Sequence, residues 1–246
     1  MLHAFGDGSI FGDVVGTNTP RVLALHGWGR TSSDFHSVLS GLDAIAVDLP
    51  GFGASPPPPL PWGTGQYATA TLAALKECAT PAVVVGHSFG GRVAVHLAAD
   101  YPELVHALVL TGTPLLRLKQ QRLKPSRKFK LAKRLNALGL ISDQKMEAHR
   151  RRSGSSDYQA AVGVMRDVLV RSVNEEYRDQ LAKITCPVEL VWGQDDTAAP
   201  VEIAKEAASI LGPRARLSIL PGVGHDTLAL APGAVRAAIV AQLERA

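Results

Sequence analysis

The stretch Ala82-Val83-Val84-Val85-Gly86-His87-Ser88-Phe89-Gly90-Gly91 decides the fold prediction. Its first four residues predict a short buried strand, and residues 89–99 carry small and apolar side chains at helical spacing. Between strand and helix lies the pattern Gly-x-Ser-x-Gly, whose glycines permit a tight turn that lifts a serine hydroxyl out of the sheet. The helix that follows would direct free N–H groups and the positive end of its dipole toward that hydroxyl. Ser88 is therefore predicted to be a nucleophile; the alternative is a glycine-rich turn that only packs a helix against a sheet.

Short β-favouring runs alternate with longer amphipathic segments on both sides of this stretch, a pattern typical of a parallel sheet with crossover helices. We expect strands at residues 21–25, 44–48, 82–86, 107–111, 187–192 and 215–220, and helices at residues 64–76 and 89–99. The prolines between residues 56 and 61 predict a stiff extended loop. The fold class is therefore α/β, with a mostly parallel central sheet covered by helices on both faces. At 246 residues, 46% of them hydrophobic, the chain suits one such domain.

One polar, helix-compatible segment, residues 116–181, interrupts this rhythm and is predicted to be a helical lid inserted between two parts of the core, residues 1–115 and 182–246. Such insertions usually lie above the carboxyl ends of the strands, where ligands bind. Residues 117–152 hold 13 Lys and Arg against two acidic residues, although the net charge of the whole chain is only +4. The simpler interpretation is a solvated cap, and the alternative is a surface that attracts an acidic protein partner or an anionic substrate.

Composition argues against several other classes. The first twenty residues lack Lys, Arg and a long apolar run, so no secretory signal is expected and the cytoplasm is the predicted compartment. No apolar run approaches the length that a membrane span needs. Cys78 and Cys186 are far apart and have no CxxC partner, so we expect core residues rather than a metal site or a disulfide. Nucleic-acid binding is not expected, because the basic segment lacks the series of interleaved aromatic residues that base stacking uses.

Two further motifs precede the serine: Leu25-His26-Gly27-Trp28-Gly29 and Asp48-Leu49-Pro50-Gly51-Phe52-Gly53-Ala54-Ser55. Together with residues 86–91, in this order and spacing, they resemble the α/β-hydrolase superfamily over nearly the whole chain apart from the basic segment. The resemblance implies that the backbone N–H groups of Trp28 and Phe89 form an oxyanion hole. It also implies that His26 braces its loop and is not a base.

A serine hydroxyl needs a base, and the base needs an orienting carboxylate. In this fold the order is Ser, acid, His, which leaves His106, His149 and His225; only His225 lies in a loop just after a late strand. That loop resembles the catalytic-histidine loop of the family. The resemblance also implies that the acid is Asp196, three residues after Gly193. Its neighbour Asp195 remains the alternative.

The turn at residues 86–90 corresponds to the nucleophile elbow of the superfamily. A serine in this elbow separates the chain from the dehalogenases and epoxide hydrolases of the superfamily, which use aspartate there. We expect hydrolysis of a carboxylic ester through an acyl-serine, with no metal or organic cofactor. The alternatives are cleavage of a C–C, amide or thioester bond, or a receptor that retains the triad. The motifs at residues 26–29 and 48–53 are similar to the pimeloyl-acyl-carrier-protein methyl ester esterases, whose arginine-bearing cap implies a carrier-linked acyl substrate. The elbow here reads Gly-His-Ser-Phe-Gly, which departs from those enzymes.

Overall fold

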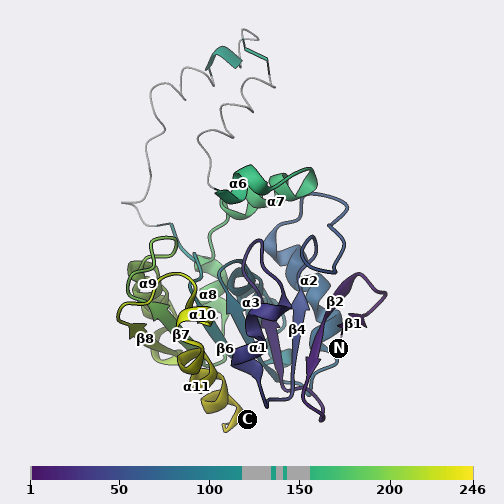
Figure 1. Ribbon diagram of the computed structural model, residues 1–246. Helices are drawn as coiled ribbons and strands as arrows, with labels where there is room; N and C mark the ends of the chain where they lie inside the picture. The colour runs from purple at the N-terminus through teal and green to yellow at the C-terminus, as the bar shows by residue number, and fades with distance from the viewer. Residues whose placement is uncertain (1, 118–133, 137–140, 143–155, 246) are drawn as a thin grey trace.

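The computed structural model describes residues 2–117, 134–136, 141–142 and 156–245. An eight-stranded sheet runs through its centre, in the order β1-β2-β4-β3-β5-β6-β7-β8 (Figure 1). The strands are β1 (Leu2–Phe5), β2 (Ile10–Val15), β3 (Val22–Leu25), β4 (Ala44–Asp48), β5 (Ala82–His87), β6 (Val105–Thr111), β7 (Val188–Gly193) and β8 (Ala215–Leu220). All pairs from β4 to β8 are parallel, whereas β2 pairs with β1 and β4 in antiparallel fashion. The predicted mostly parallel α/β sheet is confirmed.

Helices cover both faces of the sheet. The main ones are α1 (His36–Leu39), α2 (Thr64–Leu75), α3 (Phe89–Asp100), α6 (Ser156–Ala160), α7 (Val164–Ser172), α8 (Arg178–Lys183), α9 (Val201–Leu211), α10 (Thr227–Leu230) and α11 (Pro232–Leu243). Short 3-10 turns lie at Ser32–Phe35, Pro102–Leu104 and Gly212–Arg214. Residues 56–61 form neither helix nor strand, as the prolines predict.

Two hydrophobic cores separate on the two faces because successive strand residues point to opposite sides. In β3, Leu23 and Leu25 belong to the core on the side of α2, α3 and α9, whereas Val22 and Ala24 belong to the core on the side of α1 and α11. All four residues of β3 are fully buried. A parallel strand covered on both faces reads as a continuous apolar run, which is why residues 22–25 and 82–85 were recognisable as strands.

The N-terminal hairpin was not predicted, since the sequence analysis placed no strand before residue 21. In β1 only Phe5 is buried, so the strand lacks the apolar run that identifies the central strands. In β2, Gly12 lies so close to β4 that a Cβ atom there would be 2.3 Å from the Ala46 carbonyl oxygen. Gly12 and Asp13 interrupt the strand-forming residues on either side of them and so weaken the strand signal, and pairing with β4 completes the strand.

The described parts of the predicted lid include α6, α7 and α8. Helices α6 and α7 lie above the sheet in Figure 1, whereas α8 contacts α3 and α9 beside it. The division at residues 116 and 181 stays a prediction. Of the 13 basic residues in 117–152, only Arg117 and Arg134 belong to the described residues, so the predicted acidic-partner surface lies almost entirely outside them.

Within the described ranges no helix combines the length and apolarity needed to cross a bilayer, and no cluster of three His, Cys, Asp or Glu side chains could hold a metal. The cytoplasmic location stays a prediction. Both cysteines are free thiols, with Cys78 buried and Cys186 partly exposed against the core.

Candidate active site

The turn between β5 and α3 holds Ser88 in a strained backbone conformation. Ser88 has φ 50°, and no other non-glycine residue in the described ranges has a positive φ. Two glycines make the turn possible. A Cβ atom at Gly86 would lie 2.5 Å from the Gly91 Cα, and one at Gly90 would lie 2.1 Å from the Leu25 carbonyl oxygen. The first turn of α3 therefore packs directly on the ends of β3 and β5, and the serine projects from their carboxyl edge.

His225 bridges Ser88 and Asp196. Its Nε2 lies 3.0 Å from the Ser88 Oγ, and its Nδ1 lies 2.8 Å from the Asp196 Oδ2. The three residues come from loops after β5, β7 and β8, whose carboxyl ends share one edge of the sheet. The structure thus brings together the three residues that were predicted as nucleophile, acid and base.

Asp196 is held by its own loop. Its side chain is fully buried, and Oδ1 accepts hydrogen bonds from the backbone N–H groups of Ala198 at 2.9 Å and Ala199 at 2.7 Å. These two donors leave Oδ2 for the histidine. The alternative, Asp195, is exposed, and its backbone N–H bonds the Val223 carbonyl at 2.9 Å. Asp196 is therefore the one that contacts His225.

The loop that carries His225 is tied to three other parts of the site. The His225 carbonyl oxygen lies 3.0 Å from the Nε2 of His87, and the hydroxyls of Thr227 and Thr111 are in hydrogen-bond contact. Asp226 pairs with Arg30 at 3.2 Å, and Arg30 belongs to the loop after β3. None of these ties was predicted, because each joins residues more than a hundred positions apart in the sequence and no motif links the two partners.

The loop after β3 lies against the serine. A Cβ atom at Gly27 would be 3.4 Å from the Ser88 Cβ but only 2.9 Å from the His87 Nδ1, so the glycine lets the backbone lie close to residues 87 and 88. The Trp28 ring packs edge-on against the Phe52 and Phe89 rings, at centroid distances of 4.9 and 5.3 Å. Phe89 is the first residue of α3, where the helix provides no acceptor for its backbone N–H. Both predicted oxyanion-hole residues thus lie next to Ser88.

His26 joins the loops that follow β3 and β4. Its Nε2 accepts a hydrogen bond from the Leu49 N–H at 2.9 Å, and its Nδ1 lies 2.7 Å from the Gly27 carbonyl. Asp48 adds to the same brace by accepting from the backbone N–H groups of Ser32 and Ala54. His26 is fully buried and makes no contact with Ser88 in the hydrogen bonds of the described residues, which is the placement expected of a bracing residue.

Burial lowers the pKa of His26 from 6.5 to about 4. Above pH 6.5 the imidazole is mostly neutral in the folded and in the unfolded chain. Between pH 6.5 and 4 the unfolded chain binds a proton that the folded chain does not. Stability should therefore fall as the pH drops through this window, by roughly 2–3 kcal/mol from this residue. Urea unfolding at pH 7 and pH 4.5 measures the loss, and His26→Gln, which does not titrate, is the control. An equal pH dependence in wild type and variant would refute the assignment.

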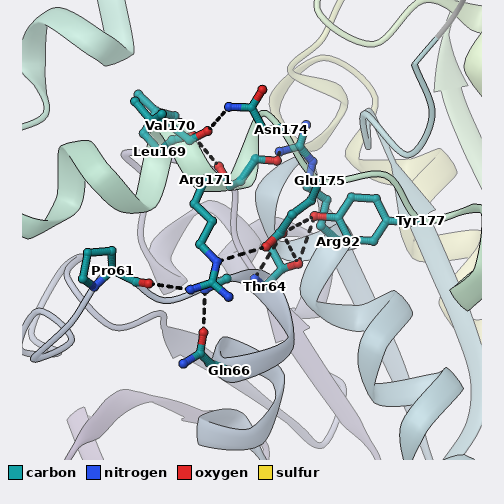
Figure 2. Close-up of polar contacts among 12 residues, drawn as sticks. Pro61, Thr64, Gln66, Arg92, Leu169, Val170, Arg171, Asn174, Glu175 and Tyr177 are labelled. Carbon is teal, nitrogen blue, oxygen red and sulfur yellow. Dashed lines mark hydrogen bonds and ion pairs between the residues drawn. The ribbon is translucent and has the colours of Figure 1, made fainter.

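A second polar network connects the segment after α7 to α2 and α3 (Figure 2). The Glu175 carboxylate accepts from the Thr64 hydroxyl at 2.6 Å and from the Tyr177 hydroxyl at 2.8 Å. Arg92, buried on α3, donates to the carbonyls of Pro114 and Ser172. Burial lowers the pKa of Arg92, and these contacts compensate part of that cost. The network fixes the end of α7 to the helix that starts at the elbow.

A pocket of about 560 Å³ lies beside this network, lined by residues that include Gln66, His96, Arg171 and Gln180. Its lining mixes acidic, basic and amide side chains, and it includes none of Ser88, Asp196 and His225. It is therefore separate from the candidate active site.

A family model described as the alpha/beta hydrolase family matches residues 22–238. An esterase of Mycobacterium tuberculosis is 44% identical over 39% of this chain, and that alignment spans only 33% of the relative. A 2-hydroxy-6-oxononadienedioate/2-hydroxy-6-oxononatrienedioate hydrolase of a Pseudomonas species is 26% identical over 89% of this chain and 86% of its own length. A pimeloyl-acyl-carrier-protein methyl ester esterase of Aromatoleum aromaticum is 29% identical over 85% and 92%.

Among solved structures, a hydrolase from Pseudomonas aeruginosa superposes with a TM-score of 0.71 over 99% of this chain and 97% of its own, at 22% identity. That likeness concerns the fold. The family match covers most of the chain, including the strands and loops that carry Ser88, Asp196 and His225. The chain belongs to the alpha/beta hydrolase family.

Proposed function

We propose that this protein is a serine hydrolase that cleaves a carboxylic ester through an acyl-Ser88 intermediate. The observation that carries the proposal is the bridge formed by His225, with one ring nitrogen 3.0 Å from the Ser88 Oγ and the other 2.8 Å from Asp196. A hydroxyl at this distance from a neutral imidazole nitrogen can transfer its proton as it attacks a carbonyl carbon. The buried carboxylate holds the ring in the tautomer that leaves Nε2 free to accept.

In the first half of the reaction Ser88 Oγ bonds to the carbonyl carbon while its proton moves to the His225 Nε2. The backbone N–H groups of Trp28 and Phe89 stabilise the negative charge on the carbonyl oxygen. The tetrahedral intermediate then collapses, and the His225 proton moves to the departing alkoxide, which leaves as an alcohol. In the second half a water gives a proton to the His225 Nε2 and attacks the acyl carbonyl. The bond between that carbon and the Ser88 Oγ then breaks, the His225 proton moves to the Oγ, and the acid is released.

The proposed substrate class is an ester of a small or carrier-linked acyl group. Support comes from the esterase names among the relatives, and in particular from the Aromatoleum aromaticum enzyme, which aligns over most of both chains. The basic residues in 117–152 would favour an acidic carrier protein, and this part of the proposal falls outside the described residues. If it holds, turnover of a carrier-linked ester should fall steeply with added salt, while turnover of the free ester should not.

The second candidate is hydrolysis of a carbon–carbon bond. It is favoured by the Pseudomonas hydrolase named for an oxo-dienedioate, which also aligns over most of both chains. Both reactions can use the same serine, histidine and aspartate, so the bond that is cleaved depends on the pocket. Two assays on the same protein preparation distinguish the two reactions. Turnover of a methyl ester reports ester hydrolysis, and turnover of a vinylogous 1,5-diketone acid reports carbon–carbon cleavage.

The test of the proposed function is a burst experiment with short-chain p-nitrophenyl esters. We expect a rapid release of close to one equivalent of p-nitrophenol per protein, followed by a slower steady rate, because acylation of Ser88 precedes hydrolysis of the acyl-enzyme. A fluorophosphonate added first should remove both phases. A folded protein that shows neither turnover nor labelling would refute the proposal and favour the receptor alternative.

A further inference from the structure

His87 precedes the nucleophile and contacts the base. It is the last residue of β5, it is 4% exposed, and its Nε2 lies 3.0 Å from the carbonyl oxygen of His225. The two imidazole rings lie with centroids 5.1 Å apart. The proposed mechanism assigns no role to His87, although it connects the main chains of the two residues that exchange the proton.

The hydrogen bond fixes the protonation of His87. A carbonyl oxygen can only accept, so the Nε2 of His87 must carry the hydrogen. Burial is the largest cause that lowers the pKa of His87, and the charge on His225 lowers it further, while the bond to the His225 carbonyl, Asp226 and Asp34 oppose the shift. The ring is therefore neutral near pH 7, and its Nδ1 carries a bare lone pair.

That Nδ1 faces the loop after β3. A Cβ atom at Gly27 would lie only 2.9 Å from it, and the atom is buried with no hydrogen-bond partner among the described residues. An unpaired buried acceptor costs free energy. A leucine of similar size would avoid that cost but could not donate to the His225 carbonyl. The donor at Nε2 is thus the feature that distinguishes histidine from an apolar residue at this position.

We propose that His87 is a positioning residue that holds the main chain of His225 at the distance from Ser88 that proton transfer requires. The inference rests on the proposed function. Ser88 and His87 are adjacent on one strand end, so the contacts Ser88 Oγ to His225 Nε2 and His87 Nε2 to His225 O close a ring of chain and hydrogen bonds. Two other ties hold this loop: the Thr111–Thr227 hydroxyl contact, which fixes it two residues after His225, and the ion pair of Arg30 with Asp226, whose side chains are 44% and 39% exposed and therefore constrain it less.

Two substitutions separate donation from packing. His87→Gln keeps an N–H at about the position of Nε2, whereas His87→Leu fills the site without a donor. We expect His87→Leu to lower kcat by about 10- to 100-fold with KM within about twofold of wild type, because misplacement of a reacting group by about 1 Å has an effect of this size. His87→Gln should restore kcat to within about fivefold of wild type.

The matched controls are His106→Leu and His106→Gln, which change a half-buried histidine near the start of β6, at the opposite end of the strand from the site. Both should leave kcat unchanged, and thermal melting should show every variant folded at the assay temperature. Equal losses in His87→Leu and His87→Gln would mean that only packing matters and would overturn the proposal. Wild-type kcat in His87→Leu would overturn it as well.

Ring ¹⁵N NMR of the full-length wild-type protein at pH 7 tests the contact without any activity. We expect His87 to be the neutral tautomer with the proton on Nε2. A proton on Nδ1, or a charged ring, would overturn the proposal whether or not esters are hydrolysed. If the NMR result holds while the wild type shows neither turnover nor labelling, the proposed function fails and the contact itself stands.

Discussion

Ser88→Ala should abolish ester turnover, with kcat lower by on the order of 10⁶-fold, because no other group can form the covalent intermediate. The remaining rate would come from the Trp28 and Phe89 N–H groups and from substrate binding, since subtilisin without its triad retains such a residual activity. The substitution removes one oxygen from a site that the glycines at 86 and 90 shape, so the fold should persist. The measurement is kcat with p-nitrophenyl acetate for wild type and variant, with circular dichroism as the check on folding.

Ser33→Ala is the control for this variant. Ser33 lies in the 3-10 turn at Ser32–Phe35 and is exposed, and its hydroxyl contacts only Thr31 among the hydrogen bonds of the described residues. Its kcat should equal that of wild type. A Ser88→Ala protein that keeps more than about a tenth of wild-type kcat and still shows a burst would assign the nucleophile to another residue.

Asp196→Asn should lower kcat by roughly 10⁴-fold with little effect on KM, the size of loss seen for the equivalent change in a serine protease. The reason is the fixed geometry of the carboxylate. Its Oδ1 accepts from the N–H groups of Ala198 and Ala199, so an asparagine would keep its oxygen there and turn its NH₂ toward His225. The Nδ1 of His225 would then have to accept, which places the proton on Nε2 and prevents that atom from taking the serine proton.

The neighbouring carboxylate provides the matched control. Asp195→Asn makes the same chemical change one residue away, on an exposed side chain. We expect its kcat to stay within about twofold of wild type. If Asp195→Asn lowered kcat more than Asp196→Asn, the contact between Asp196 and His225 would be structural. Asp195, the alternative from the sequence analysis, would then be the acid.

The sequence predicts the centre of this molecule better than its edges, for physical reasons. Strands such as β3 and β5 are buried on both faces and therefore consist of uninterrupted apolar residues, which no other local structure explains as well. The edge strand β1 buries a single residue and depends on pairing with β2, so its own residues carry a weak signal. At the candidate active site, likewise, local features were predictable and contacts between distant residues were not.

Ser88 was recognisable because the Gly-x-Ser-x-Gly turn depends on neighbouring residues in the sequence. The conformation of Asp196 also depends on its neighbours, since the N–H groups of Ala198 and Ala199 donate to its carboxylate. The contact between His87 and His225 joins residues 138 positions apart, and that between Arg30 and Asp226 joins residues 196 apart. Such ties depend on how separate loops meet at the edge of the sheet. Neither residue periodicity nor motif spacing contains that information.

The most direct test of the central claim is to trap the acyl-enzyme and locate it. Wild-type protein is mixed with a p-nitrophenyl ester, quenched in acid during the burst, and measured by intact mass and by peptide sequencing. We expect a mass increase of one acyl group, located on Ser88, and no such adduct in Ser88→Ala. An adduct on another residue, or a burst without any covalent adduct, would contradict the assignment of Ser88 as the nucleophile.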